Sequence, residues 1–184
     1  GAALDAVEMS RLQPCAGVPV EDPALCPAGY TATTLWLDDL ESGAGNWTQS
    51  TARGLDRWSI DAVFASSGER HLFGNAADGV SDSAMEMVAD VHIPAGSRMH
   101  FRHSYGFERD STDSYDAGVV EYSINGGETW VDAGDLMAAG ATYGGSISDC
   151  CGNPLAGRIA FVGDSFGYTA TRVDLSALAG TDLR

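Results

Sequence analysis

Residues 163–167 read Gly-Asp-Ser-Phe-Gly, which is the spacing of a nucleophile elbow, where a sharp turn after a strand exposes a serine. Acyl transfer by Ser165 would require a helix after the turn, and then an acid and a histidine to activate the hydroxyl. The segment after Gly167 instead has a strand-like composition, and the last histidine of the chain is His103. The motif therefore does not predict a catalytic serine.

The histidines do not form a zinc-binding pattern. His100 and His103 are three positions apart, a spacing that brings two rings to one side of a helix but to opposite faces of a strand. The chain also has no H-E-x-x-H motif, in which two histidines bind zinc and the glutamate acts as a base. We therefore expect no catalytic residues in this chain and predict that it is not an enzyme.

Four acidic residues, Glu108, Asp110, Asp113 and Asp116, crowd the segment before Gly118. Their spacing does not match an EF-hand, so they form either a solvated acidic loop or a calcium loop completed by backbone carbonyls. Paired carboxylates could also serve glycoside hydrolysis, but nothing in the sequence places them across a cleft.

The charge of the chain limits the classes of partner that we expect it to bind. Its 184 residues include 26 acidic and 10 basic side chains, giving a net charge of −16 and an isoelectric point near 4.2. Phosphate binding depends on clustered cations, so we expect no nucleic-acid partner. No apolar run reaches the roughly 18 residues of a membrane span. We therefore expect one compact domain with an extra segment and no membrane span.

The four cysteines predict disulfides and a secreted, extracellular protein, because no C-x-x-C pair or zinc spacing is present. Cys15 and Cys26 lie in one proline-constrained connector, and we expect them to pair and stabilise the fold by about 2 to 4 kcal/mol. Cys150 and Cys151 could then form a vicinal bridge, stay reduced or pair between chains. We favour the vicinal bridge because the residues lie in an apparent turn. The first residues lack the pattern of a signal peptide, so we expect that any such peptide has been removed.

The pattern of apolar residues predicts one helix and then an all-β region. Residues 3–12 place Leu4, Val7 and Leu12 on one helical face, and a proline- and glycine-rich connector follows to residue 31. We therefore divide the chain into residues 1–31, helix and connector, and residues 32–184, a β-sandwich. Asn125-Gly126-Gly127 predicts a hairpin turn. The expected strands are Thr34–Leu40, Arg57–Ala62, Ala84–His92, Arg98–Tyr105, Gly118–Ile124, Thr129–Asp132, Arg158–Val162 and Ala170–Leu175.

Several segments resemble a known family when taken in order. They are D-D-L-E-S-G-A-G-N-W-T, R-W-S-I-D, F-R-H-S-Y-G-F-E, Y-D-A-G-V-V-E-Y-S-I-N-G-G-E-T-W-V-D-A-G, G-R-I-A-F-V-G-D-S-F-G-Y and V-D-L-S-A-L-A-G. The region from Leu37 onward resembles the non-catalytic β-sandwich domain of secreted bacterial zinc metallopeptidases of the fungalysin and thermolysin-like kinds, and more distantly a MAM domain. Ala3–Ser10 is similar to the last helix of such a peptidase, so residues 1–31 could close a preceding peptidase domain.

The resemblance implies an antiparallel, jelly-roll-like β-sandwich that acts as an accessory or recognition module of a metallopeptidase. Its partner would be a substrate, a cell surface, another protein or a second copy of itself. A carbohydrate-binding module is the alternative, with Trp47, Trp58, Tyr143 and Tyr168 as candidates for stacking on sugar rings.

The resemblance also implies a structural calcium ion. Asp39-Leu40-Glu41 matches the D-F-E opening of related domains, and we expect Asp39, Glu41, Asp116 and Asp174 to bind Ca²⁺. Related domains continue past the segment that resembles V-D-L-S-A-L-A-G with further strands. We therefore expect either that the gene product continues beyond Arg184, or that another chain adds the strands that close the sheets.

Overall fold

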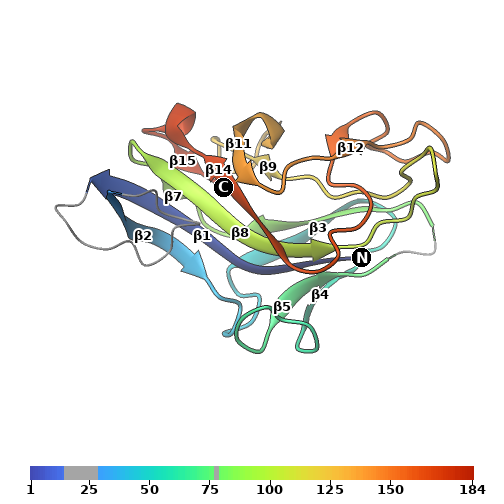
Figure 1. Ribbon diagram of the computed structural model, residues 1–184, viewed down its shortest axis with the longest axis horizontal. Helices are drawn as coiled ribbons and strands as arrows, with labels where there is room; N and C mark the ends of the chain where they lie inside the picture. Colours follow the sequence, from blue (N-terminus) through green and yellow to red (C-terminus); the bar gives the residue numbers. More distant parts are fainter. Residues whose placement is uncertain (15–28, 77–78) are drawn as a thin grey trace.

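The protein is built from β-strands that belong mainly to one large antiparallel sheet. The computed structural model describes residues 1–14, 29–76 and 79–184. Its seven-stranded sheet has the order β11-β14-β8-β1-β5-β4, and β2 pairs with the remaining part of β1. Figure 1 shows β1 and β8 running side by side through the middle of the molecule. All recorded strand pairs are antiparallel, so the all-β prediction is confirmed.

Fifteen strands and two short 3-10 turns lie within the described residues. They are β1 Ala2–Pro14, β2 Tyr30–Asp38, β3 Trp47–Arg53, β4 Trp58–Asp61, β5 His71–Gly74, β6 Asp82–Met87, β7 Val91–His92, β8 Ser97–Tyr105, β9 Glu121–Tyr122, β10 Val131–Asp132, η1 Gly134–Leu136, β11 Met137–Gly140, β12 Gly145–Ser146, β13 Ile159–Ala160, β14 Thr169–Asp174, η2 Ser176–Leu178 and β15 Asp182–Leu183.

The predicted N-terminal helix over residues 3–12 is wrong, because these residues form most of β1. Ala3, Asp5, Val7 and Met9 are buried at every second position, which is the period of a strand. The same short apolar run also fits a helical face, so its periodicity is ambiguous. Pairing with β8 on one edge, and with β5 and then β2 on the other, decides in favour of a strand over a helix. Tertiary contacts therefore override the local helix preference.

A second layer covers one face of this sheet but is divided into pieces. Among the described residues it consists of four two-stranded pairs, β3 with β6, β7 with β15, β9 with β10, and β12 with β13. In Figure 1, β9, β12 and β15 lie in the upper part of the view, where β11 and β14 of the large sheet also lie. The arrangement is sandwich-like, with one continuous layer and one interrupted layer.

The hydrophobic core lies between the two layers. The inner face of the large sheet contributes Val7, Met9, Phe101 and Val173, and the second layer contributes residues such as Met87. Leu175, Leu178 and Leu183 close the core near the C-terminus. Burial of these side chains supplies the main stabilising force of the fold.

Every predicted strand region contains a strand, although several are shorter than expected. Thr34–Leu40 overlaps β2, and Ala84–His92 contains parts of both β6 and β7. The predicted hairpin is confirmed, since β9 and β10 pair across Asn125-Gly126-Gly127 and both glycines have positive φ angles. Within the described ranges, no helix is long and apolar enough to cross a membrane.

Candidate functional site

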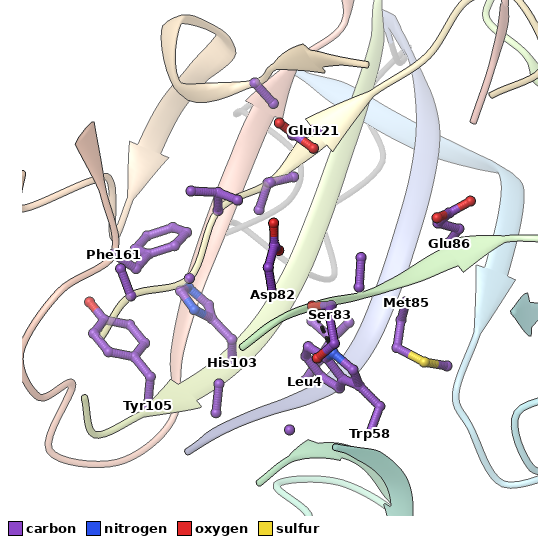
Figure 2. A pocket seen from close by; sticks show the side chains of 18 of the residues that line it. Leu4, Trp58, Asp82, Ser83, Met85, Glu86, His103, Tyr105, Glu121 and Phe161 are labelled. Atoms are coloured by element: carbon purple, nitrogen blue, oxygen red, sulfur yellow. Dashed lines mark hydrogen bonds between the residues drawn. The ribbon is translucent and has the colours of Figure 1, made fainter. Parts of the chain in front are cut away.

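A cleft of about 610 Å³ reaches from the surface to the inner face of the large sheet. Figure 2 shows side chains from β1, β6 and β8 around it, including Leu4, Met85 and His103. One wall is β6, and the opposite wall is the segment from Asp116 to Tyr122. The cleft therefore lies where the second layer is interrupted.

The floor of the cleft carries a cluster of aromatic rings. The ring centroid of His103 is 4.7 Å from that of Phe161 and 5.5 Å from that of Tyr105, which in turn lies 5.4 Å from Phe107. His103 and Tyr105 share one face of β8, as the alternation in the sequence predicts. The floor therefore offers broad, flat apolar surface to a ligand.

His103 is a neutral member of this floor. Its side chain is buried, and burial lowers its pKa from 6.5 to about 4. Its Nε2 lies 2.9 Å from the hydroxyl of Thr171, which donates to the carbonyl of Ala141. The imidazole Nε2–H is thus the donor to Thr171, which fixes the ring in the sheet.

The β6 wall carries both apolar and acidic side chains. Met87 is buried in the core and Met85 is half-buried at the cleft. The indole Nε1 of Trp58 donates to the carbonyl of Ser83 at 3.3 Å, so Trp58 closes the lower end of this wall. Asp82 and Glu86 lie between the apolar positions, and among the described residues neither carboxylate has a hydrogen-bond or ion-pair partner.

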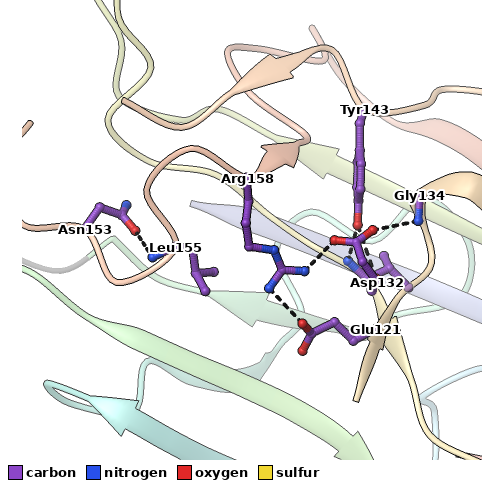
Figure 3. Close-up of polar contacts among 8 residues, drawn as sticks. Glu121, Asp132, Gly134, Tyr143, Asn153, Leu155 and Arg158 are labelled. Atoms are coloured by element: carbon purple, nitrogen blue, oxygen red, sulfur yellow. Dashed lines mark hydrogen bonds and ion pairs between the residues drawn. The ribbon is translucent and has the colours of Figure 1, made fainter. Parts of the chain in front are cut away.

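The opposite wall is held in place by a polar cluster, shown in Figure 3. Arg158 forms ion pairs with Glu121, at 2.7 Å, and with Asp132. The hydroxyl of Tyr143 accepts a hydrogen bond from the amide of Val120 at 2.7 Å. Burial raises the pKa of Tyr143 to about 12, so this phenol stays protonated at neutral pH. These contacts fix residues 120–121 in place, and Arg158 and Glu121 themselves line the cleft.

The four predicted calcium ligands are spread over three places. Asp39 Oδ1 accepts the amide of Glu41, and Glu41 Oε1 accepts the amides of Glu69 and Arg70 at 2.8 and 2.9 Å. Asp174 forms an ion pair with Arg98. Asp116 lines the cleft wall, away from these contacts.

Among the residues that the structure describes, no three histidine, cysteine or acidic side chains gather into a metal-binding group. Asp39 and Glu41 thus share one turn, whereas Asp116 and Asp174 do not join them in a ligand set. The acidic loop before Gly118 is organised around Asp110, which accepts hydrogen bonds from the amides of Thr112 and Asp113 and from the Tyr115 hydroxyl. These bonds lower the pKa of Asp110.

Ser165 forms local backbone contacts. Its hydroxyl lies 3.1 Å from the carbonyl of Tyr105 and 2.8 Å from that of Gly167, and it accepts the amide of Tyr105 at 2.8 Å. The serine thereby ties the turn after β13 to the end of β8. The geometry assigns it a clear structural role.

The aromatic residues considered for sugar binding are separated. Trp47 donates to Asp38 and packs against the core, and Tyr143 is held by Val120. Tyr168 stacks on Phe64 with ring centroids 5.3 Å apart. Trp58 faces the cleft.

Cys150 and Cys151 lie at disulfide distance and form the favoured vicinal bridge, with Cα atoms 3.8 Å apart. The predicted Cys15–Cys26 pair lies outside the described residues. The carbonyl of Gly152, next to the bridge, accepts a hydrogen bond from Arg53 at 3.0 Å. This bond connects the loop to β3 next to the cleft, which the neighbouring residues Ala52 and Asn153 line.

Sequence reasoning named Trp47, Trp58 and Asp116, which line the cleft, but it missed most of the residues that form the walls. The alternation of Met85, Glu86 and Met87 signals a strand with one apolar face, but it does not reveal that the strand borders a gap. A comparison with known proteins found no matching family model, no matching curated protein and no matching solved structure. The assignment of function therefore depends on the cleft itself.

Proposed function

We propose that this chain is a non-catalytic, extracellular recognition module of a secreted metallopeptidase, and that it binds a protein ligand in the cleft. The observation that carries this proposal is the open, apolar cleft of about 610 Å³ with its aromatic floor. Ligand pockets are usually apolar hollows of about 300 to 1,000 Å³ with a few polar groups at defined places. The jelly-roll topology and the association with a peptidase rest on the family resemblance.

The chemistry of the cleft suits binding. The inner face of the large sheet would otherwise be exposed to water through the cleft, and exposed apolar surface of this kind marks interaction sites. The acidic side chains at the walls add a preference for a basic or neutral ligand. Ser165 and His103 are both engaged in structural contacts, which supports a role without catalysis.

A permanently unfolded polypeptide, reduced and carboxymethylated lactalbumin, is a suitable first probe. We expect it to bind the full chain in calorimetry, and we expect Met85→Arg to weaken binding at least tenfold because it puts a charge in the cleft. Val63→Arg is the matched control, since Val63 is 88% exposed and does not line the cleft. Equal binding by both variants, with both folded by circular dichroism, would contradict the proposal.

A carbohydrate ligand is the second candidate, favoured by the position of Trp58 at the cleft. Sugar rings stack on exposed indole faces. A glycan array that gives binding to wild type and none to Trp58→Ala, without binding of the unfolded polypeptide, would select this alternative.

The calcium ion remains a separate proposal with its own measurement. A site that binds Ca²⁺ only in the folded state raises Tm, and the stabilisation grows with the logarithm of the calcium concentration once this exceeds Kd. We expect a higher Tm in millimolar calcium than in chelator, and a smaller difference in Glu41→Gln. An unchanged Tm would rule out a stabilising site.

A further inference from the structure

The C-terminal strand β15 already fills one end of the interruption in the second layer. It pairs with β7 on one side, where Leu183 lies opposite Val91. On the other side, Arg184 and Ser123 exchange two backbone hydrogen bonds of 2.8 and 2.9 Å. At this end, therefore, one strand connects the β7 side of the layer to the segment that leads into β9.

Beyond Arg184 the two sides continue as the walls of the cleft, and β6 turns backbone groups toward the gap. The amide of Val88 bonds to the carbonyl of Asn46, which makes this an exchanging pair of the β3–β6 ladder. In an antiparallel ladder such pairs alternate with pairs whose backbone groups point away from the partner. By this alternation, the backbone N–H and C=O groups of Ser83, Met85 and Met87 point away from β3. The hydrogen bond from Trp58 to the carbonyl of Ser83 is consistent with this direction.

The opposite wall has the same property. Gly118 exchanges two backbone bonds with Phe161, and the carbonyl of Val120 accepts the amide of Ala133. The alternate residues, Val119 and Glu121, therefore direct their amides and carbonyls toward the cleft, on the same edge that Ser123 uses to pair with Arg184. Within the described part of the chain, no backbone hydrogen bond reaches Val119, Glu121, Met85 or Met87 from the cleft side.

We propose that the cleft is a vacant strand position, and that it binds an extended segment of a partner polypeptide as an added β-strand. The segment would run antiparallel to both walls, in the same direction as β15 and in line with it. Its backbone would pair with Met85 and Met87 on one side and with Val119 and Glu121 on the other. This inference deepens the proposed function and rests on it, because it specifies how the cleft recognises its ligand.

The side chains on the two walls also determine which side chains the bound segment can carry. Met87 and Val120 belong to or pack against the core, so the positions between them face the aromatic floor and favour apolar residues. The intervening positions lie beside Glu86 and Glu121 at the surface. Glu121 is neutralised by Arg158, whereas Glu86 has no partner among the described residues. A segment that alternates apolar side chains with lysine or arginine is therefore complementary in shape and in charge.

The test uses a capped hexapeptide that alternates valine with lysine. We expect it to bind the full chain and to slow amide hydrogen exchange at Met85, Met87, Val119 and Glu121, as measured by NMR. The amides of Gly118 and Val120 already donate to Phe161 and Tyr143, so their exchange should stay unchanged. A peptide of the same composition with three valines followed by three lysines is the sequence control.

A second peptide isolates the backbone bonds. Methylation of alternate peptide nitrogens removes the donors of one edge but keeps every side chain, and we expect it to weaken binding by about tenfold or more, since each lost bond is worth about 1 kcal/mol. Glu86→Lys should weaken the lysine peptide and strengthen a peptide that alternates valine with glutamate. Val63→Arg is again the control.

The outcomes separate the two proposals. If the methylated peptide binds as tightly as the parent, the cleft still recognises a ligand but the added strand is excluded. If neither peptide binds and the unfolded polypeptide does not bind either, the proposed function fails as well. If the chain forms dimers in sedimentation whose cleft amides are protected without peptide, the occupant is a second copy and the proposal is overturned. If a form of the protein that continues past Arg184 has these amides protected without peptide, the occupant is the continuation of the same chain and the proposal is likewise overturned.

Discussion

The two layers of this protein differ in how completely their strand edges are paired. In the large sheet, β1 is paired on both edges almost along its whole length, by β8 on one side and by β5 and β2 on the other. Among the described residues, the second layer consists of four short pairs beside a cleft, and no backbone hydrogen bond reaches Met85, Met87, Val119 or Glu121 from the cleft side. A fully paired interior strand contributes stability, whereas an unpaired edge is a place where another strand can add.

The contrast assigns different roles to similar side chains. Met9 on β1 and Met85 on β6 both face the space between the layers, yet Met9 is 1% exposed and Met85 only half-buried. Met9 therefore contributes to the packed core, whereas Met85 borders the cleft in which we propose that a ligand binds. Substitutions in the two layers should separate these effects.

We expect the largest difference in the free energy of unfolding between Met9→Ala and Met85→Ala. Met9→Ala removes a fully buried side chain from the core and should lower the free energy of unfolding by about 2 to 5 kcal/mol. Met85→Ala borders an open cleft that water already enters, so we expect a loss of about 1 kcal/mol or less, because little cavity is created. Urea unfolding of both variants measures the difference. Equal losses would show that the cleft wall is as well packed as the core.

We expect a smaller effect on stability from the protonation of His103, which belongs to the large sheet but faces the cleft. Its pKa is about 4 in the folded protein and about 6.5 when unfolded, so between these values the unfolded chain binds a proton that the folded chain excludes. The free energy of unfolding should therefore fall as pH is lowered from 6.5 to 4, by about 3 kcal/mol from this residue.

His103→Gln tests this pH dependence, since glutamine keeps a donor for Thr171 and does not titrate. Other groups also titrate in this range, so the relevant quantity is the difference in slope between the variant and wild type. Urea unfolding at pH 4, 5, 6 and 7 gives both slopes. If the variant loses stability as steeply as wild type, then His103 is not the source.

The sequence predicts most strands but not the way in which they are combined. The hairpin at Asn125-Gly126-Gly127 was predictable because its turn chemistry is local. β1 was not, because Leu4, Val7 and Leu12 fit one face of a helix while Val7 and Met9 also fit the alternation of a strand, and only pairing with distant strands decides between helix and strand. Strands such as β3, Trp47–Arg53, escaped because their exposed residues lack a clear alternation.

The site was less predictable than the fold. The sequence suggests functional roles for single residues such as Ser165 and Asp116, because the type of a side chain indicates its chemistry. The strand-binding site that we propose depends instead on backbone groups of Met85, Met87, Val119 and Glu121, and every residue carries such groups, so no motif marks them. The vicinal pair of Cys150 and Cys151 was predictable since adjacency and a turn are both local features.

The smallest effect is expected for the vicinal disulfide, which lies in the loop at one end of the cleft. A disulfide stabilises mainly by restricting the unfolded chain, and the restriction grows with the number of residues in the closed loop. Cys150 and Cys151 are adjacent, so the bridge closes almost no loop. The double variant Cys150→Ser, Cys151→Ser should therefore change the free energy of unfolding by about 1 kcal/mol or less.

The bond from Arg53 to the Gly152 carbonyl makes the loop part of the cleft border, so the same variant should alter hexapeptide binding more clearly than stability. Calorimetry and urea unfolding of one sample compare the two. A loss of stability comparable to that of Met9→Ala would mean that the interrupted layer also supports the fold, and the division between the layers would be wrong.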